Sequence, residues 1–375
     1  MTAASKARDK GMVVTYSERP DRSEHEHGTH VALASRLADL LGMEFAGPHD
    51  PGRACGRRIY FVPADTIVGR DKAARLGIRG ESDLFGGVVG QAYMATKSIT
   101  HPLPERAARM PRGWSAAFAR QVRDAVLAGL SAFSPEDARA AGRRLLRRGA
   151  VRIKPAGACA GRGQSVARDE AELDRALAGI DAAELARLGL VLEEHLEDVE
   201  TYSVGQVRVG DLVASYFGTQ RLTADAQGAM VYGGSRLAVF RGGFDALPAR
   251  GLDEPVRRAI ACARAYDAAA MRCFPGLLAS RRNYDVARGR DAQGRLRVGV
   301  LEQSWRPGGA SSAEILALEA FQADPALPAV RTASVEVYGE GGTPPPGAVP
   351  IFRGTDRKAG PMTKYAMVES DGNEQ

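Results

Sequence analysis

The most informative segment of the chain is Val151-Arg-Ile-Lys-Pro-Ala-Gly-Ala-Cys-Ala-Gly-Arg-Gly-Gln-Ser-Val166. It predicts a short apolar strand that carries Lys154 and runs into a glycine-rich loop. Gly157, Gly161 and Gly163 allow main-chain N–H groups to approach an anion, and the lysine supplies a compact positive charge. The combination is typical of a phosphate-binding site. A plain turn at the end of a strand has the same composition, so both interpretations stay open at this point.

Two well-known nucleotide-binding loops are excluded for this stretch. In a Walker loop the lysine follows the glycines and a Ser or Thr comes next, whereas Lys154 precedes them. The segment 161–166 also lacks the third glycine of the dinucleotide fingerprint. A phosphate role for this stretch therefore needs support from the rest of the chain.

The composition is that of a globular protein with room for two or three subdomains. The chain has 375 residues, of which 44% are hydrophobic and 26% charged, and its formal net charge is +6. The positive surplus would suit phosphate-bearing small molecules as partners, although we favour a solvated, arginine-rich surface as its explanation. Because acidic and basic residues are interspersed along most of the sequence, no nucleic-acid surface is indicated.

The cysteines and the lengths of the apolar runs indicate the cellular compartment of the protein. Cys55, Cys159, Cys262 and Cys273 form no C-x-x-C pair, which favours reduced thiols over disulfides or a zinc site. We find no secretory signal and no apolar run as long as a membrane span. We therefore expect a cytoplasmic protein that contacts no membrane.

The first part of the chain predicts a parallel α/β layer. Segments 13–16, 43–46 and 58–62 have the character of strands, and 29–41 that of an amphipathic helix. Between them lies His25-Glu-His-Gly-Thr-His30. Thr29 stands where the zinc-hydrolase pattern has an aspartate, so we favour a loop that caps the helix over a metal site.

The rest of the chain predicts helices and antiparallel pairs in alternation. Helices are expected at 122–130, 134–147, 169–177, 253–271 and 313–321. Strand 190–196 ends in acids, and hairpins are expected at 201–217 and 282–304. The arginines and glycines of 218–252 predict a loop-rich segment near a ligand, and 361–375 a tail.

Three features of the chain follow one another along the sequence. They are a strand with a lysine that runs into a glycine-rich loop, a strand that ends in acids, and an antiparallel pair of strands that carries two acids. In this order the chain resembles the ATP-grasp superfamily. The resemblance covers roughly Lys97 to Gly309. The chain is also similar to a proteobacterial-type family of unknown function that carries this fold. The resemblance implies an α/β and α+β architecture: a Rossmann-like (preATP-grasp) α/β domain, then two α+β subdomains that sandwich ATP. The implied divisions are 1–110 for the N-terminal domain, 111–190 for the small subdomain with its lid, 191–330 for the large subdomain with the metal site, and 331–375 for a C-terminal extension with a partly disordered tail.

The same resemblance implies a nucleotide site and a metal site. The residues implied to bind ATP are Lys97, Lys154, Gly161, Gly163, Gln164, Ser165, Glu193, Glu194, Leu196 and Glu200. Asp285, Glu302 and Ser304 are implied to hold one or two magnesium ions, which prefer hard oxygen ligands. Taken singly, Asp285 could cap a turn and Glu302 could pair with a neighbouring arginine.

The chain departs from the family pattern at Ser304, where the family usually has an asparagine ligand. Either water completes the metal shell, or Asn283 contributes from the facing strand. The catalytic candidates are Arg282, just ahead of the first acid with Arg281 as its alternative, and Arg306, expected to face the substrate carboxylate. Arg236 is the third, chosen from a set expected to face the transferred phosphate that also includes Arg221 and Arg241.

The implied reaction has two steps. A substrate carboxylate attacks the terminal phosphate of ATP, and an amine or similar nucleophile then displaces phosphate from the acyl phosphate. The partners would be a small-molecule carboxylate and an amine or peptide, with a possible homodimer. A small-molecule kinase of the same superfamily, or a nucleotide-binding protein without catalysis, are the alternatives.

Overall fold

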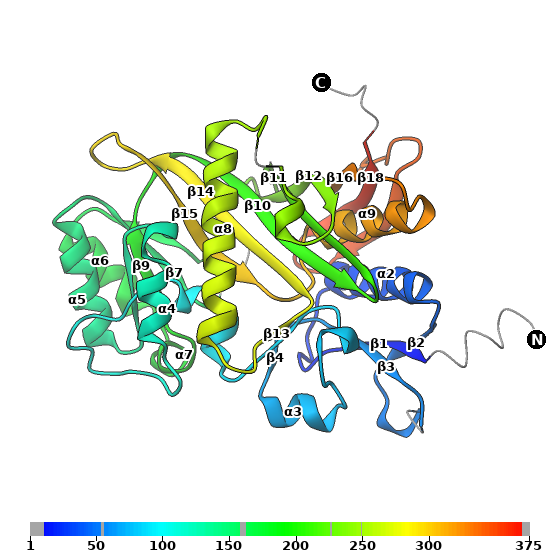
Figure 1. Cartoon of the computed structure of the whole chain (residues 1–375). Helices are drawn as coiled ribbons and strands as arrows, with labels where there is room; N and C mark the ends of the chain where they lie inside the picture. The colour runs from blue at the N-terminus through cyan, green and yellow to red at the C-terminus, as the bar shows by residue number, and fades with distance from the viewer. Residues whose placement is uncertain (1–10, 54–55, 158–162, 226, 249, 370–375) are drawn as a thin grey trace, which may run out of the picture.

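The computed structural model describes residues 11–53, 56–157, 163–225, 227–248 and 250–369. The described strands form an eight-stranded sheet, a four-stranded sheet and two three-stranded sheets. The four-stranded sheet and the N-terminal three-stranded sheet lie at opposite ends of the molecule, and the eight-stranded sheet runs between them (Figure 1).

The N-terminal sheet is parallel, with strand order β2-β1-β3, as the sequence predicted. Its elements are β1 (Met12–Tyr16), α2 (Glu24–Leu41), β2 (Glu44–Pro48) and β3 (Ile59–Pro63). Leu33 and Leu37 of α2 are buried in the cluster that also contains Val13. Because all three strands run in one direction, their carboxyl ends meet at one edge of the sheet, where ligands bind in many α/β proteins.

The histidine-rich motif lies inside α2, so its interpretation as a loop was wrong. The helix begins one turn earlier than predicted because Ser23 caps it, with its hydroxyl accepting from the Glu26 backbone N–H at 3.4 Å. Glu24 and Glu26 occupy the first turn, where the helix dipole favours acids.

A second three-stranded sheet, in the order β13-β5-β4, links the N-terminal part to the large sheet. Its strands are β4 (Ile67–Val68), β5 (Gly87–Val89) and β13 (Leu278–Ala279), with α3 (Arg70–Arg75) after β4. Short 3-10 turns lie at Pro51–Arg53, Glu81–Asp83, Ala92–Ala95 and Lys97–Ile99. The Gln303 side chain donates to the carbonyls of Met94 and Thr96, which fixes the segment ahead of Lys97 against the large sheet.

The four-stranded sheet has the order β6-β9-β7-β8. Its elements are α4 (Ala116–Gln121), a 3-10 turn (Arg123–Ala125), β6 (Gly129–Ala132), α5 (Pro135–Leu146), β7 (Val151–Pro155), β8 (Ser165–Ala167), α6 (Glu170–Ala178), α7 (Ala182–Leu188) and β9 (Leu190–Glu194). The strand that carries Lys154 is therefore confirmed. The predicted helix at 122–130 is wrong: Val126 bridges Val300, and Leu130 pairs with Leu192 in the sheet.

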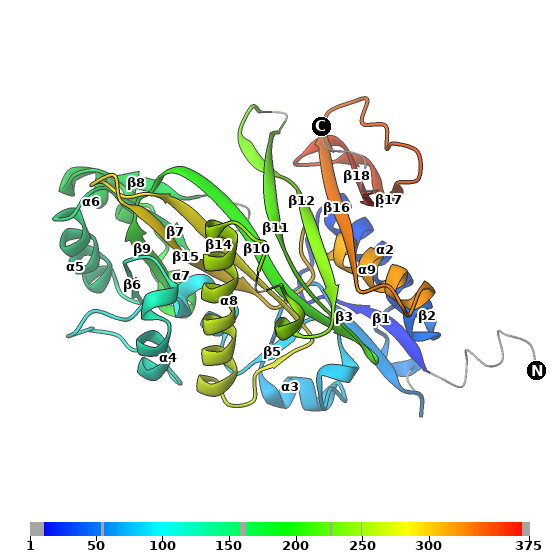
Figure 2. The same cartoon turned by 45° about the horizontal axis from the view of Figure 1, so that its top comes forward.

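The eight-stranded sheet has the order β15-β14-β10-β11-β12-β16-β18-β17, and its long, twisted strands are clearest in Figure 2. Its strands are β10 (Glu197–Val209), β11 (Leu212–Ala224), β12 (Met230–Arg241), β14 (Arg281–Arg290), β15 (Leu296–Ser304), β16 (Ala329–Tyr338), β17 (Val349–Asp356) and β18 (Gly360–Val368). Its helices are a 3-10 turn (Phe244–Ala246), α8 (Glu254–Cys273) and α9 (Ser311–Ala323).

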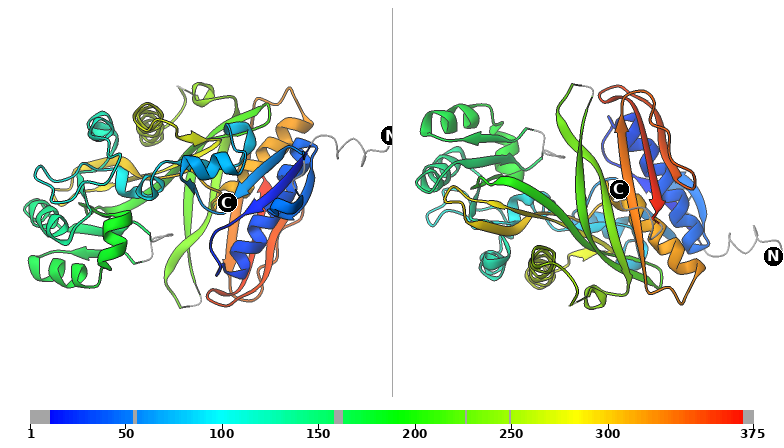
Figure 3. Two further views of the ribbon diagram at one scale, coloured as in Figure 1. Left: turned by 90° about the horizontal axis from the view of Figure 1, so that it is seen from below. Right: turned by 90° about the horizontal axis from the view of Figure 1, so that it is seen from above.

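Helices cover the two faces of this sheet at different places. α8 packs on one face, where Tyr266 and Tyr284 share a buried cluster. On the other face α9 packs with α2, in a cluster that includes Tyr216 and Leu318. Figure 3 shows α2 and the C-terminal strands against each other in both views (blue and orange to red).

Two sequence expectations for this region are wrong. Residues 218–252 are mostly strand rather than loop, because their glycines allow close approach of neighbouring strands: a Cβ on Gly218 would lie 1.9 Å from the Arg236 carbonyl oxygen. The predicted tail begins with β18, in which Ala366 is fully buried. Strands β16 to β18 thus continue the large sheet.

Within the described ranges, no helix combines the length and the apolar character needed to cross a membrane.

Candidate functional site

Asp285 and Glu302 lie directly opposite each other on the antiparallel strands β14 and β15. Asn283 and Ser304 form the next pair on the same face. The register changes immediately after Asp285, where one strand bulges. Since directly opposite side chains in an antiparallel pair are close neighbours, the two carboxylates form a single acidic unit.

Lys97 forms an ion pair with one member of this acidic pair, Glu302. Its Nζ lies 3.0 Å from Glu302 Oε2, and the lysine is 4% exposed against 33% for the glutamate. Burial would raise the pKa of Glu302, but Lys97 and Lys154 outweigh it and hold that pKa below its usual value. The two lysines therefore act on the same carboxylate, although they lie 57 residues apart in the chain.

Asp285 has the opposite electrostatic environment. Burial and the negative charge of Glu302 raise its pKa to about 6, against hydrogen bonds from Asn283 and Gln220 that favour its charged form. The Asn283 Nδ2 donates to Asp285 Oδ1 at 2.9 Å, and the Gln220 Nε2 donates at 2.7 Å. Two like charges held this close favour a cation between them.

Lys154 is buried in an ion pair with Glu193, at 2.8 Å between Nζ and Oε1. His101 Nε2 lies 3.1 Å from the other carboxylate oxygen, so both oxygens of Glu193 have partners. Burial would raise the pKa of Glu193, yet the Lys154 charge and the His101 hydrogen bond lower it to about 2. We name Lys97, Lys154, Glu193, Asp285 and Glu302 together the lysine–acid cluster.

The other residues predicted at the nucleotide site lie along the connection from β9 to β10. Glu194 Oε1 accepts from the Ala128 backbone N–H and from Arg297. Leu196 is buried in a small apolar cluster, and Glu200 is 58% exposed and pairs with Arg288 at 2.8 Å. Their roles in binding adenine and ribose stay predictions.

The glycine-rich loop is described only in part, and Gly161 lies outside the described residues. Gly163 has a φ of +69°, a left-handed conformation that favours glycine. Gln164 accepts from Arg152 Nη1 at 3.1 Å, and Ser165 pairs with Ile153 at the start of β8. The end of the loop is thus anchored to the strand that carries Lys154.

The three candidate arginines lie in different places. Arg306 follows β15 closely enough to act on Glu302, whose pKa it helps to lower. Arg282 lies on the opposite face of β14 from Asp285, where it pairs with Asp267 and with Glu81. Arg236 shares that opposite face, because it aligns through β11 and β10 with the residue next to Asp285, and it pairs with Glu369. Neither Arg282 nor Arg236 is brought to the lysine–acid cluster.

Sequence reasoning missed a buried network behind the acidic pair. Arg281 Nη2 and Nε donate to Glu314 of α9 at 2.6 and 3.0 Å, and both residues are almost completely buried. Arg281 Nη1 also donates to the Ser304 hydroxyl at 3.2 Å. The Tyr216 hydroxyl lies 2.6 Å from Glu314 Oε1 and 2.9 Å from Asn283 Oδ1. The only sequence signal for this network was Arg281, one of the two candidates for the arginine ahead of Asp285, because Glu314 lies in a helix with no motif.

This network changes the view of Ser304. Its hydroxyl faces a guanidinium, and a positive charge at that distance disfavours a second cation as a partner of the same oxygen. Across the described residues, no group of three or more His, Cys, Asp or Glu side chains could hold a metal. A metal at Asp285 and Glu302 would therefore depend on neutral oxygens for its remaining ligands.

Comparisons with known proteins identify the family and the fold. Residues 13–366 match a family described as "Protein of unknown function (DUF3182)". No curated protein sequence gives a significant match. Among solved structures, carboxyaminoimidazole ribonucleotide synthase from Aspergillus clavatus, complexed with ATP, is similar with a TM-score of 0.51 and 13% identity, over 96% of this chain and 94% of that one.

Biotin carboxylase from Campylobacter jejuni, in a β,γ-ATP complex, is similar to the same degree. The TM-score is 0.51 at 12% identity, over 96% of this chain and 87% of that one. Identity this low speaks for the fold alone, and the fold it shows is the ATP-grasp fold, as the order of motifs predicted.

Proposed function

The chain belongs to the DUF3182 family, and from its lysine–acid cluster we propose that it is an ATP- and magnesium-dependent ligase that activates a substrate carboxylate. The observation that carries the proposal is the pairing of Asp285 with Glu302 beside Lys97, with Lys154 acting on the same glutamate. Two acids for a metal and two lysines for phosphates are the residue types that phosphoryl transfer from ATP needs.

The residues fit magnesium better than a metal that needs a complete protein cage. Mg²⁺ is usually bound by one or two carboxylates, with waters and substrate phosphates as its other ligands. Asp285 and Glu302 provide two carboxylates on one face, and the like-charge effect that raises the Asp285 pKa would be relieved by a cation. When bound there, magnesium would neutralise the charge that develops on the phosphate oxygens.

We propose that Asn283, and not Ser304, supplies a neutral oxygen to this metal. The Tyr216 hydroxyl has a single proton, and a carboxylate such as Glu314 is a stronger acceptor than an amide oxygen. When the Tyr216 hydroxyl donates its hydrogen bond to Glu314, the Tyr216 oxygen can accept a hydrogen bond from the amide N–H of Asn283. Rotation of the amide by half a turn then directs its oxygen toward Asp285, where it would face the cation.

The reaction follows from ATP and a carboxylate as substrates. A carboxylate oxygen forms a bond to the γ-phosphorus while the bond from that phosphorus to the bridging oxygen breaks, which releases ADP and leaves an acyl phosphate. An amine nitrogen then attacks the carbonyl carbon, the C–O bond to phosphate breaks, and the amine loses a proton. Lys97 and Lys154 would balance the phosphate charges throughout, and Arg306 would hold the substrate carboxylate.

Phosphate release by the purified chain tests this proposal. The protein is incubated with ATP and Mg²⁺ and pools of carboxylates and amines, and we expect release that needs one member of each pool. Glu302→Gln removes a metal ligand but keeps the size of the side chain. Because a metal contributes several kcal/mol and 1.36 kcal/mol is tenfold in rate, we expect a loss of about 1000-fold or more.

Glu340→Gln, an exposed change in the loop between β16 and β17, is the matched control and should leave release unchanged. Phosphorylated carboxylate or alcohol that accumulates without any amine would identify a kinase instead. ATP binding that is insensitive to both Mg²⁺ and Glu302→Gln would contradict the site itself.

A further inference from the structure

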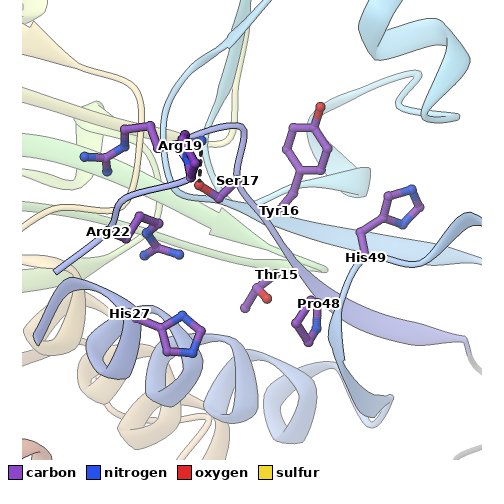
Figure 4. Close-up of a pocket in the computed structure, with 9 residues that line it drawn as sticks. Thr15, Tyr16, Ser17, Arg19, Arg22, His27, Pro48 and His49 are labelled. Carbon is purple, nitrogen blue, oxygen red and sulfur yellow. Dashed lines mark hydrogen bonds between the residues drawn. The ribbon is translucent and has the colours of Figure 1, made fainter. Parts of the chain in front are cut away.

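A cavity of about 350 Å³ opens at the carboxyl ends of β1 and β2, beside the first turns of α2 (Figure 4). Arg19, Arg22, His27 and His49 line it, and none of the described residues that line it is acidic. A cavity of this size can hold a small molecule, and it lies at the edge of a parallel sheet where α/β proteins bind ligands.

Arg22 is held in this cavity by neutral groups. Its Nη1 lies 2.8 Å from His30 Nδ1, and its Nη2 donates to the Glu26 carbonyl at 3.0 Å. A guanidinium only donates, so His30 Nδ1 must accept, and the imidazole proton is on Nε2, which lies 2.6 Å from the Val62 carbonyl oxygen. His30 is therefore neutral, in agreement with burial and the Arg22 charge, which lower its pKa to about 4.

The neighbouring Arg19 shows what a compensated charge looks like. Its Nε lies 2.7 Å from Asp65 and its Nη1 3.5 Å from Glu26. No carboxylate in the described chain forms an ion pair with Arg22, and its buried Nε has no hydrogen-bond partner there. A half-buried guanidinium that keeps its charge and a spare donor is suited to an anion.

His49 contributes a second buried nitrogen that could bond to a ligand. The Phe61 ring packs against it at 5.1 Å between centroids, and the Tyr16 ring at 6.2 Å, so the imidazole is fixed in place. Its Nδ1 is buried without a hydrogen-bond partner among the described residues. Burial lowers the pKa of His49, although the negative charge of Asp50, the next residue, favours the charged form.

The cavity is joined to the lysine–acid cluster through a short loop. Asp65, the partner of Arg19, is followed by Thr66, whose hydroxyl donates to the Trp305 carbonyl at 3.2 Å. Arg306, the residue after Trp305, helps to lower the pKa of Glu302. The edge of the N-terminal sheet thus meets the end of β15.

We propose that this Arg22 cavity binds an oxyanion, a phosphate or carboxylate group, on a substrate of the ligase. Arg22 is its main ligand, and His27 and His49 also line the cavity. That the bound molecule is a substrate rests on the proposed function, but binding of the anion does not. The two claims can therefore fail separately.

Imidazole ¹⁵N spectra of the whole chain can separate the two claims, because it has only six histidines. His27 and His49 report on the cavity, and His101 reports on the lysine–acid cluster through Glu193. Inorganic phosphate and acetate are titrated separately. We expect at least one of them to shift the His27 and His49 signals, whether or not phosphate also reaches the lysines and shifts that of His101, and the stronger of the two identifies the class of anion.

Arg22→Gln should weaken this response by about 10-fold or more, since hydrogen bonds to charged groups contribute about 1.5–3 kcal/mol. Arg57→Gln is the matched control, because Arg57 is also partly buried but pairs with Glu44 and Gly11 at the opposite edge of the same sheet. It should leave the response unchanged.

The proposal is overturned if neither anion moves His27 or His49, if only His101 responds, or if Arg22→Gln binds as tightly as the wild type. ATP with Mg²⁺ is added in a separate series. If it leaves His101 unmoved while the cavity still responds to an anion, the proposed function fails and the cavity proposal stands.

Discussion

The lysine–acid cluster and the Arg22 cavity both present positive charge, but they hold it in different ways. Lys154 and Lys97 each contact a carboxylate, at 2.8 and 3.0 Å. Arg22 instead contacts a neutral imidazole and a backbone carbonyl. A buried ion pair fixes its members in place and makes each dependent on the other, whereas a cation on neutral acceptors keeps its charge for a ligand. Removing a charge should therefore have different consequences in the two regions.

Stability is expected to show the largest difference. Lys154→Ala leaves the Glu193 carboxylate, 1% exposed, with only His101 as a partner, and breaking a buried pair in this way costs about 3–5 kcal/mol. Arg22→Gln leaves no buried carboxylate behind, so we expect a loss of about 1 kcal/mol or less, the value of ordinary hydrogen bonds. Urea unfolding of both variants and the wild type measures the two values.

The double variant Lys154→Ala/Glu193→Gln is the control, because it removes the orphaned charge along with its partner. It should recover much of the stability that Lys154→Ala loses. If Lys154→Ala and Arg22→Gln destabilise the protein equally, the two regions do not hold charge differently and the comparison is wrong.

Acid should weaken the two regions in separate pH windows. The pKa of His30 is lowered to about 4 from 6.5, so its stabilising effect is present above 6.5 and is lost as pH falls toward 4. The pKa of Glu193 is lowered to about 2 from 4.5, so its effect is present above 4.5 and is lost as pH falls toward 2. Between pH 6.5 and 4.5 only the first of these two contributions declines.

Unfolding free energies at pH 7 and pH 5 test this order, and we expect His30 to account for a loss on the order of 2 kcal/mol. His30→Gln keeps an acceptor for Arg22 but cannot titrate, so its stability should change less over this range. An ¹⁵N signal of His30 that shows a charged imidazole at pH 5.5 would contradict the assignment.

The sequence predicted elements whose causes are local. The helix at Pro135–Leu146 was foreseen because Ser134 caps it and a proline and two acids follow. The error at 122–130 has the opposite origin: Val126 and Leu130 are apolar because of Val300 and Leu192, which lie far along the chain. An apolar run does not reveal whether its partners are four residues away or more than a hundred.

The same limit applies to the site. Lys154 and Glu302 were named because motif order survives in sequence, and the structure brings both to one cluster. The bonds from His101 to Glu193 and from Arg281 to Glu314 span 92 and 33 residues and leave no local pattern. Arg282 and Arg281 were both candidates because the sequence left a one-residue offset open, and on a strand that offset changes the face: the pleat directs Arg282 away from Asp285.

The smallest expected effect asks whether the lysine–acid cluster also depends on a neutral group, as the Arg22 cavity does. Asn283 donates to Asp285 at 2.9 Å, and Ser304, its cross-strand neighbour, accepts from Arg281. If Asn283 supplies the neutral metal oxygen, Asn283→Ala should raise the Mg²⁺ concentration that half-saturates ATP binding by about 10-fold, the lower end for groups that tune a metal site. Ser304→Ala should change it less than about 2-fold, because that hydroxyl accepts from a buried guanidinium, whose positive charge disfavours a cation beside the same oxygen. Calorimetric titrations of ATP at a series of Mg²⁺ concentrations measure both, with urea unfolding to verify that each variant is folded. A larger shift for Ser304→Ala than for Asn283→Ala would indicate that Ser304 of β15, and not Asn283, is the metal ligand.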